Sequence, residues 1–240
     1  MRPTLLVSDV HLSPARPEIA DLFLRFLDHA ASDAAALYIL GDLFDIWVGD
    51  DDPLPLNAAV MAALGRLSAA GTAVYVMSGN RDFLFGSGFL RRTGARLLPD
   101  PTLLEMDGVR TLLMHGDTLC ADDLAYQRAR RRYRRPWVLR GFLALPRPAR
   151  VAIGRHFRRK SERTKRATAP RIMDVSTSTV ESALRAHGYP RLIHGHTHRP
   201  ACHLHIVDGH RCERWVLGDW YERGSYLRSD ASGLTRVALG

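Results

Sequence analysis

The sequence predicts an α/β fold in which two mixed β-sheets form a sandwich flanked by helices. Two observations predict it: short apolar runs alternate with helical patterns in the first third of the chain, and two hairpin patterns follow later. A chain of 240 residues is long enough for one such domain with a large core. We therefore expect a single domain over residues 1–240.

The first third of the chain alternates between strand and helix patterns. Continuous apolar runs predict strands at Thr4–Ser8, Ala36–Leu40 and Ala73–Met77. Helices are expected between them, at Pro17–Ala31 and Pro55–Ala70. This β-α-β-α-β order indicates an open sheet with helices packed on it. A turn region is expected to follow.

Two hairpins are expected in the remainder. Asp107-Gly108 and Asp208-Gly209 each lie between two strand-like runs, and this dipeptide is a strong hairpin signal. A helix is expected at Thr177–Ala186. The strands expected to make a second sheet are Thr102–Met106, Val109–Met114, Arg191–Ile193, Ala201–Val207, His210–Leu217 and two late strands near Gly224–Arg228 and Leu234–Ala238.

The composition bears on the compartment. The chain is 46% apolar but has no apolar run near 18 residues, which argues against a transmembrane helix. The first strand starts at Thr4, so no secretory signal is expected.

The three cysteines are not expected to form disulfides. A two-residue turn at Asp208-Gly209 would set Cys202 opposite Trp215 and Cys212 opposite His205, so this pair is out of register. A reducing cytoplasm is the simplest compartment for such a chain.

Seven side chains able to bind metal follow the predicted strands at five places. The carboxyl ends of strands are where open α/β sheets gather their active sites. A lone Asp-x-His or His-x-His would be weak evidence, but five such blocks in order do not arise easily from composition. The seven residues are Asp9, His11, Asp42, Asn80, His115, His196 and His198.

These residue types predict a two-metal phosphoesterase site. A carboxylate can bridge two divalent cations, and Asp42, which directly follows Gly41, is the natural bridge. An oxygen and imidazole shell suits Mn²⁺, Fe²⁺ or Zn²⁺, and the lack of thiolate argues against structural zinc. Two such ions activate water and clamp an in-line displacement at phosphorus. We assign Asp9, His11 and His198 to one ion and Asn80, His115 and His196 to the other.

The five blocks resemble the calcineurin-like metallophosphoesterase superfamily. With Asp122–Gln127 and Val216–Tyr221 added, about the whole chain resembles its UDP-2,3-diacylglucosamine pyrophosphatase family, which acts in lipid A biosynthesis. The resemblance implies a calcineurin-like sandwich with a helical lid and hydrolysis of UDP-2,3-diacylglucosamine to UMP and 2,3-diacylglucosamine 1-phosphate (lipid X). It implies water attack on the α-phosphorus and two divalent ions, usually Mn²⁺. The implied catalytic residues are Asp42, Asn80, Arg81 and His196.

Arg81 supports this family on physical grounds. Many members of the superfamily carry histidine at this position, where it can protonate an alkoxide leaving group. Arginine cannot deliver a proton, but its planar fork can neutralise phosphate oxygens. That suits a pyrophosphate, because its leaving group is a weakly basic phosphate that needs little acid catalysis. The alternative is a surface arginine that merely follows a ligand.

The segment Arg128–Arg171 is strongly basic. It holds seventeen Lys and Arg and a single acid, Glu162, so its net charge is +16 against −7 for the rest of the chain. Large apolar residues such as Trp137, Phe142 and Phe157 are interleaved with the charges. Prolines at 136, 146 and 148 are expected to break the segment into short helices.

Three interpretations of this insert, at about residues 122–172, remain open. It could pack on its own core with a solvated charged rim, bind nucleic acid, or form a lipid-binding lid that also contacts anionic membrane. Its place between His115 and His196 favours the lid, since an apolar groove with a basic rim matches a substrate with two acyl chains and a pyrophosphate.

The resemblance also implies contacts with substrate. One position, Thr168, departs from the lysine that the family often has there. Asp122 could instead be the N-cap of a helix at Asp123–Arg132. The implied substrate-binding residues are Asn80, Arg81, Asp122, Ser161, Lys165, Thr168 and His196.

The expected partners follow from the same resemblance. They are the lipid substrate and an anionic membrane surface, with a peripheral location on the cytoplasmic face of the bacterial inner membrane. No nucleic acid and no obligate protein partner is expected. Two alternatives stay open: a nucleotide or nucleic-acid phosphodiesterase with the same metals, and a non-catalytic module, whose mark would be a missing ligand.

Overall fold

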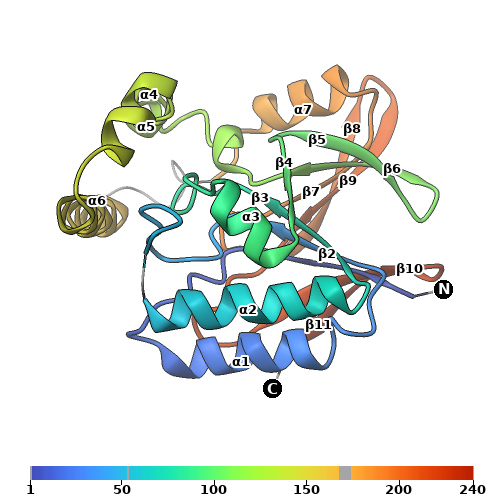
Figure 1. Cartoon of the computed structure of the whole chain (residues 1–240). Helices are drawn as coiled ribbons and strands as arrows, with labels where there is room; N and C mark the ends of the chain where they lie inside the picture. Colours follow the sequence, from blue (N-terminus) through green and yellow to red (C-terminus); the bar gives the residue numbers. More distant parts are fainter. Residues whose placement is uncertain (1, 53, 168–173, 240) are drawn as a thin grey trace.

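The structure is a computed structural model that describes residues 2–52, 54–167 and 174–239, with the backbone alone for 162–167. Two mixed sheets stack on each other (Figure 1), which confirms the predicted sandwich. One sheet holds β1 (Thr4–Val7), β2 (Ala36–Leu40), β3 (Ala73–Met77), β4 (Arg96–Leu98), β10 (Ser225–Asp230) and β11 (Gly233–Ala238). The other holds β5 (Thr102–Met106), β6 (Val109–Met114), β7 (Arg191–His194), β8 (Ala201–Val207) and β9 (His210–Val216).

The strand orders are β11-β10-β1-β2-β3-β4 and β5-β6-β7-β9-β8. β1 to β4 run parallel, as do β6, β7 and β9, so their carboxyl ends lie at common edges. The parallel strands therefore deliver their following loops to one region of the sandwich.

The late strands correct the sequence-based assignment. They were expected in the second sheet, but β10 pairs antiparallel with β1 and lies in the first, with Leu6 opposite Leu227. The expected turn region after β3 also contains a helix, α3 (Ser87–Thr93), and the edge strand β4. Gly94 ends α3 at a φ of +67°, a backbone conformation that glycine adopts without strain.

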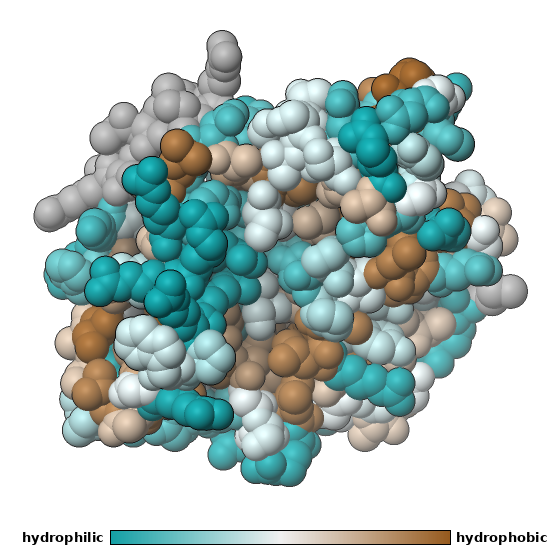
Figure 2. Space-filling model, turned by 90° about the horizontal axis from the view of Figure 1, so that it is seen from above, coloured by the Kyte–Doolittle hydropathy of each residue, from teal (hydrophilic) through white to brown (hydrophobic). Residues whose placement is uncertain are grey.

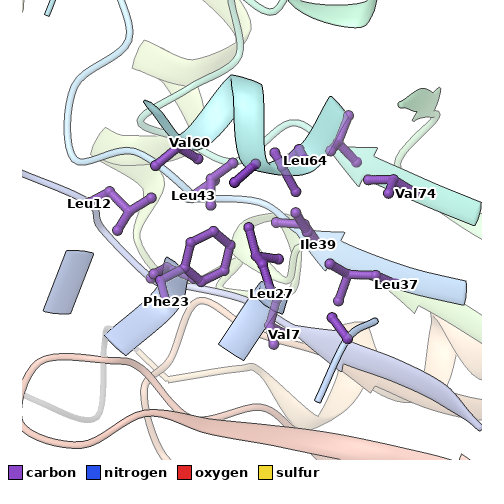
Figure 3. Close-up of a cluster of buried hydrophobic side chains, with 14 of the residues drawn as sticks. Val7, Leu12, Phe23, Leu27, Leu37, Ile39, Leu43, Val60, Leu64 and Val74 are labelled. Atoms are coloured by element: carbon purple, nitrogen blue, oxygen red, sulfur yellow. The ribbon is translucent and has the colours of Figure 1, made fainter. Parts of the chain in front are cut away.

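Alternating side chains divide the core into layers. Leu5 and Val7 point to an outer layer under α1 (Pro17–Asp28) and α2 (Pro55–Ala69), while Leu6 points between the sheets. Figure 3 shows part of the outer layer, where Phe23 and Leu27 of α1 meet strand residues such as Ile39. Both helices carry proline in the first turn, where no helical N–H bond is lost.

The second sheet has its own outer layer. Leu112 and Leu192 pack with Val180 and Leu184 of α7 (Thr177–Ala186), whereas Leu113 turns inward to the layer between the sheets. The two-residue period thus places apolar side chains on both faces of the central strands, as buried parallel strands require.

Three helices form the insert: α4 (Leu124–Tyr133), α5 (Pro136–Leu143) and α6 (Arg147–Ala167). They lie to one side of the sandwich, at the left of Figure 1. The expectation of short helices is wrong for α6, which runs for 21 residues. Pro148 stands in its first turn, where proline is tolerated, and so it does not break the helix.

The cysteine register is confirmed. Cys202 pairs with Trp215 and Cys212 with His205 across the β8–β9 hairpin, and all three cysteines are free thiols. Within the described residues, no helix is long and apolar enough to cross a membrane.

Candidate active site

The structure brings the seven predicted ligands together. The loops after β1, β2, β3, β6 and β7 carry them. Asp9, His11, Asp42 and His115 form a buried floor, each at most 2% exposed. Asn80, His196 and His198 are partly exposed and form its mouth. The cluster is therefore accessible from the side on which these three residues lie.

The loop backbones are unusual at the ligands. Asp9, His11, Asp42, His196 and His198 all have φ between +51° and +69°. Such left-handed conformations are uncommon for residues with a side chain and gather at functional sites. Glycine permits close approach beside the ligands, because a Cβ at Gly41 would lie 2.5 Å from Nδ1 of His115 and one at Gly79 would lie 2.1 Å from Oδ1 of Asp42.

One group of ligand atoms lies around Asp9. Its Oδ1 is 3.3 Å from Nε2 of His198 and 3.9 Å from Nε2 of His11, and these two nitrogens are 3.4 Å apart. Ligand atoms about 2.0–2.2 Å from one ion lie roughly 3–4 Å from each other. The buried Asp9 Oδ1 has no hydrogen-bond donor within the described chain, as suits an atom reserved for a cation.

The second group lies around Asn80. Its Oδ1 is 3.1 Å from Nε2 of His115 and 3.0 Å from Nδ1 of His196. Two imidazoles and an amide oxygen thus converge at the spacing of ligands that share an ion.

Asp42 lies between the two groups. Its Oδ2 is 3.9 Å from Nε2 of His11, and its Oδ1 is 3.9 Å from Nε2 of His115. The two oxygens of one carboxylate face the two groups, which is the geometry of a bridging ligand.

The electrostatics of the floor favour positive charge. Burial alone would lower the pKa of His115, but the carboxylates of Asp42, Asp117 and Asp9 outweigh it and raise the pKa to about 9. A site that stabilises imidazolium in this way also stabilises a divalent cation.

Two carboxylates that sequence reasoning did not single out hold the ligands in place. Asp82 accepts hydrogen bonds from the backbone N–H groups of Asp42, Leu43 and Gly79, at 3.2, 2.7 and 2.9 Å. Burial and the nearby Asp42 charge raise the pKa of Asp82 to about 7. Asp219 lies 2.8 Å from Nδ1 of His198. The available signal was their position: Asp82 follows Asn80 by two residues, and Asp219 lies within the segment Val216–Tyr221 that carries the resemblance.

Asp117 joins the cluster to the insert. It follows His115 by two residues in a short 3-10 helix, η1 (Asp117–Leu119), and its Oδ2 accepts from the Tyr126 hydroxyl and from Nε of Arg130, both at 2.6 Å. Arg134 donates to the carbonyl of Gly79 at 2.7 Å. Helix α4 is thereby fixed to the loops that carry His115 and Asn80.

A cavity of about 260 Å³ lies between the insert and the cluster. Asn80 and Arg81 lie at one end of its lining, and Arg130, Arg134 and Arg158 add positive charge. Its apolar wall comes from α5, α6 and the loop after β2, through Val138, Leu139, Phe142, Ile153, Phe157, Ile46, Trp47 and Val48. Figure 2 shows that hydrophilic and hydrophobic residues are mixed on the surface at the side of the insert.

The predicted substrate contacts are not all together. Ser161 lines the cavity with Asn80 and Arg81, whereas Asp122 is exposed and outside the lining. The proposal that Asp122 caps the following helix is wrong, because Asp123 is the N-cap and accepts from the N–H of Tyr126 at 2.9 Å. The side chain of Lys165 and all of Thr168 lie outside the described part of the chain.

Comparison with known proteins gives consistent matches. The family model described as calcineurin-like phosphoesterase matches residues 2–200. A protein of Aromatoleum aromaticum is 51% identical over 230 residues, which are 95% of this chain and 94% of that protein. One from Stenotrophomonas maltophilia is 49% identical over 98% of each chain, and one from Xanthomonas axonopodis pv. citri is 50% identical over 98% of this chain and 99% of its own. All three bear the name UDP-2,3-diacylglucosamine hydrolase.

Proposed function

The chain belongs to the calcineurin-like phosphoesterase family, and we propose on that premise that it hydrolyses UDP-2,3-diacylglucosamine to UMP and 2,3-diacylglucosamine 1-phosphate in lipid A biosynthesis. The proposal rests on one observation: the ligand cluster borders a largely apolar cavity that is lined by four arginines. The shared name of the relatives supports the substrate.

We propose that the cluster holds two divalent cations, Mn²⁺ in the working enzyme. The spacing of the two groups and the buried oxygen of Asp9 fit this arrangement, and the donor set of oxygens and imidazoles suits Mn²⁺. When bound, the ions would supply acidified water and neutralise charge at phosphorus. One ion would be held by Asp9, His11 and His198, and the other would be held by Asn80, His115 and His196. Asp42 would contact both ions.

Arg81 would bind the pyrophosphate. Its backbone N–H donates to Asp42 Oδ1 at 2.8 Å, which fixes the start of its side chain beside the bridging carboxylate. The guanidinium can then bind phosphate oxygens in two-point fashion as water attacks the α-phosphorus. The leaving phosphate monoester departs without an acid from the protein.

The insert would act as a lid for the acyl chains, with Ser161 and, by family resemblance, Asp122, Lys165 and Thr168 among the contacts to substrate. We propose that the insert and the sandwich form a single domain over residues 1–240. Its basic surface would hold the protein at the anionic cytoplasmic leaflet, where each Lys or Arg contributes about 1 kcal/mol.

The test is product identification by mass after incubation of Mn²⁺-loaded protein with UDP-2,3-diacylglucosamine, with bis(p-nitrophenyl) phosphate and with single-stranded DNA. UMP and a lipid phosphate support the proposal. The net charge of +16 over Arg128–Arg171 keeps a nucleic-acid phosphodiesterase as second candidate. DNA cleavage that falls steeply with salt, with no cleavage of the lipid, would establish that candidate instead.

A further inference from the structure

The lid cavity accounts for the lipid half of the proposed substrate, but not for the nucleotide half. We propose that Arg16 and Tyr221 form the subsite for that half, a layered aromatic and cationic platform for a pyrimidine nucleoside monophosphate. The inference rests on the proposed function and adds a residue pair to it.

The lid and Tyr221 contact different ligands of the cluster. Tyr126 of the insert lines the cavity, and its ring centroid is 6.1 Å from that of His196. Tyr221 instead packs beside the other group of ligands, with centroid distances of 5.2 Å to His11 and 5.5 Å to His198. The two halves of the substrate join at the attacked phosphorus, so the half that does not enter the cavity must leave the cluster along another path. Tyr221 lies beside the ligands there and outside the cavity lining.

Arg16 completes the platform. Its guanidinium carbon lies 4.5 Å from the centroid of the Tyr221 ring, and its Nη2 donates to the carbonyl oxygen of His11 at 2.6 Å. The order of groups is therefore imidazole, phenol and guanidinium. Because the same arginine is tied to a ligand loop, the platform keeps a fixed position relative to the cluster.

The platform has capacity for a ligand. Tyr221 is 41% exposed, whereas the neighbouring Trp220 is fully buried. Arg16 makes no ion pair with the described residues, and its buried Nη1 has no hydrogen-bond partner among them. Packing within the protein does not explain why the Tyr221 ring is exposed to solvent beside Arg16.

A nucleotide matches these groups. Pyrimidine bases stack on aromatic rings and on the plane of arginine, and the guanidinium can at the same time attract a phosphate. The uracil ring of the nucleotide would pack against this platform, with the phosphate of the nucleotide toward the cluster.

The experiment measures binding of UMP and of ribose 5-phosphate to the Mn²⁺-loaded protein by calorimetry. Wild type is compared with Arg16→Gln, Tyr221→Leu and the lid variant Phe142→Ser. We expect wild type to prefer UMP, and each platform variant to weaken UMP binding by about tenfold or more while ribose 5-phosphate changes less. Phe142→Ser should leave UMP binding as it is and weaken binding of the lipid 1-phosphate.

Metal content and hydrolysis of bis(p-nitrophenyl) phosphate report on the cluster in every variant. Tyr221→Leu keeps the test decisive if Arg16→Gln disturbs the His11 loop, because no described hydrogen bond joins Tyr221 to a ligand loop. Unchanged UMP affinity in Tyr221→Leu overturns the subsite. If wild type releases no UMP from UDP-2,3-diacylglucosamine, the proposed function itself is wrong; if it does and the platform variants bind UMP normally, the subsite alone is wrong.

Discussion

A carboxylate oxygen of Asp219 lies 2.8 Å from Nδ1 of His198. When Nδ1 donates to this carboxylate, Nε2 is the nitrogen left to bind an ion, and it lies 3.3 Å from Asp9 Oδ1. Histidine ligands in proteins commonly have their second nitrogen fixed in this manner, which sets the tautomer and the orientation of the ring.

Asp219→Ala should therefore weaken metal binding by about 10- to 100-fold without loss of the fold. Titration of the metal-free protein with Mn²⁺, followed by electron paramagnetic resonance, measures the change. Asp230→Ala removes a partly exposed carboxylate that contacts Arg228 and Ser232, and should leave the affinity as in wild type. Equal affinities for Asp219→Ala and Asp230→Ala would exclude the orienting role.

Asp42→Ala should be the most damaging change at a single ligand, because one carboxylate faces both groups. We expect a loss of at least about a thousandfold in kcat with UDP-2,3-diacylglucosamine, and bound metal below two ions per chain. Circular dichroism should still show a folded protein. Activity above about a tenth of wild type with full metal content would contradict the bridging role.

Arg81→Lys should restore little activity, because lysine keeps the charge but loses the planar two-point contact with phosphate. Arg81→His should not rescue cleavage of the pyrophosphate, although it can help esters whose leaving group is a basic alkoxide. Steady-state kinetics with both substrate types distinguish these effects. A gain in pyrophosphate turnover for Arg81→His would show that the reaction needs a proton donor at this position.

Phe142→Ser should raise KM for the diacylated substrate by about tenfold or more, since the lost aromatic side chain contributes roughly 1.5–3 kcal/mol of burial. Trp137→Ser is the matched control: Trp137 belongs to the same helix but is 66% exposed and lies outside the cavity lining. KM for bis(p-nitrophenyl) phosphate should change in neither variant. Equal effects of the two substitutions on the lipid substrate would place the acyl chains elsewhere.

The ligand set could be predicted because each member is locally encoded. An apolar strand followed within a few residues by glycine and a carboxylate or imidazole is visible in a short window, as at Gly41 and Asp42. The supporting carboxylates Asp82 and Asp219 are not locally encoded in this way. Asp82 acts on backbone groups about forty residues earlier, and no local pattern records that distance.

The errors in the fold have a similar origin. The two-residue alternation around Leu227 shows that one face of β10 is buried, but it does not say which sheet the strand joins, and pairing with β1 decides that. Pro148 was expected to interrupt a helix, and instead stands in the first turn of α6. Proline is compatible with both positions, so its presence alone could not distinguish them.

Hydrolysis in water enriched in ¹⁸O tests the central claim most directly. The Mn²⁺-loaded protein is incubated with UDP-2,3-diacylglucosamine under single-turnover conditions, and the ¹⁸O content of both products is measured by mass spectrometry. Attack of water on the α-phosphorus places one ¹⁸O in UMP and none in the lipid 1-phosphate. Label in the lipid phosphate, or no cleavage of this substrate by metal-loaded protein, would contradict the account.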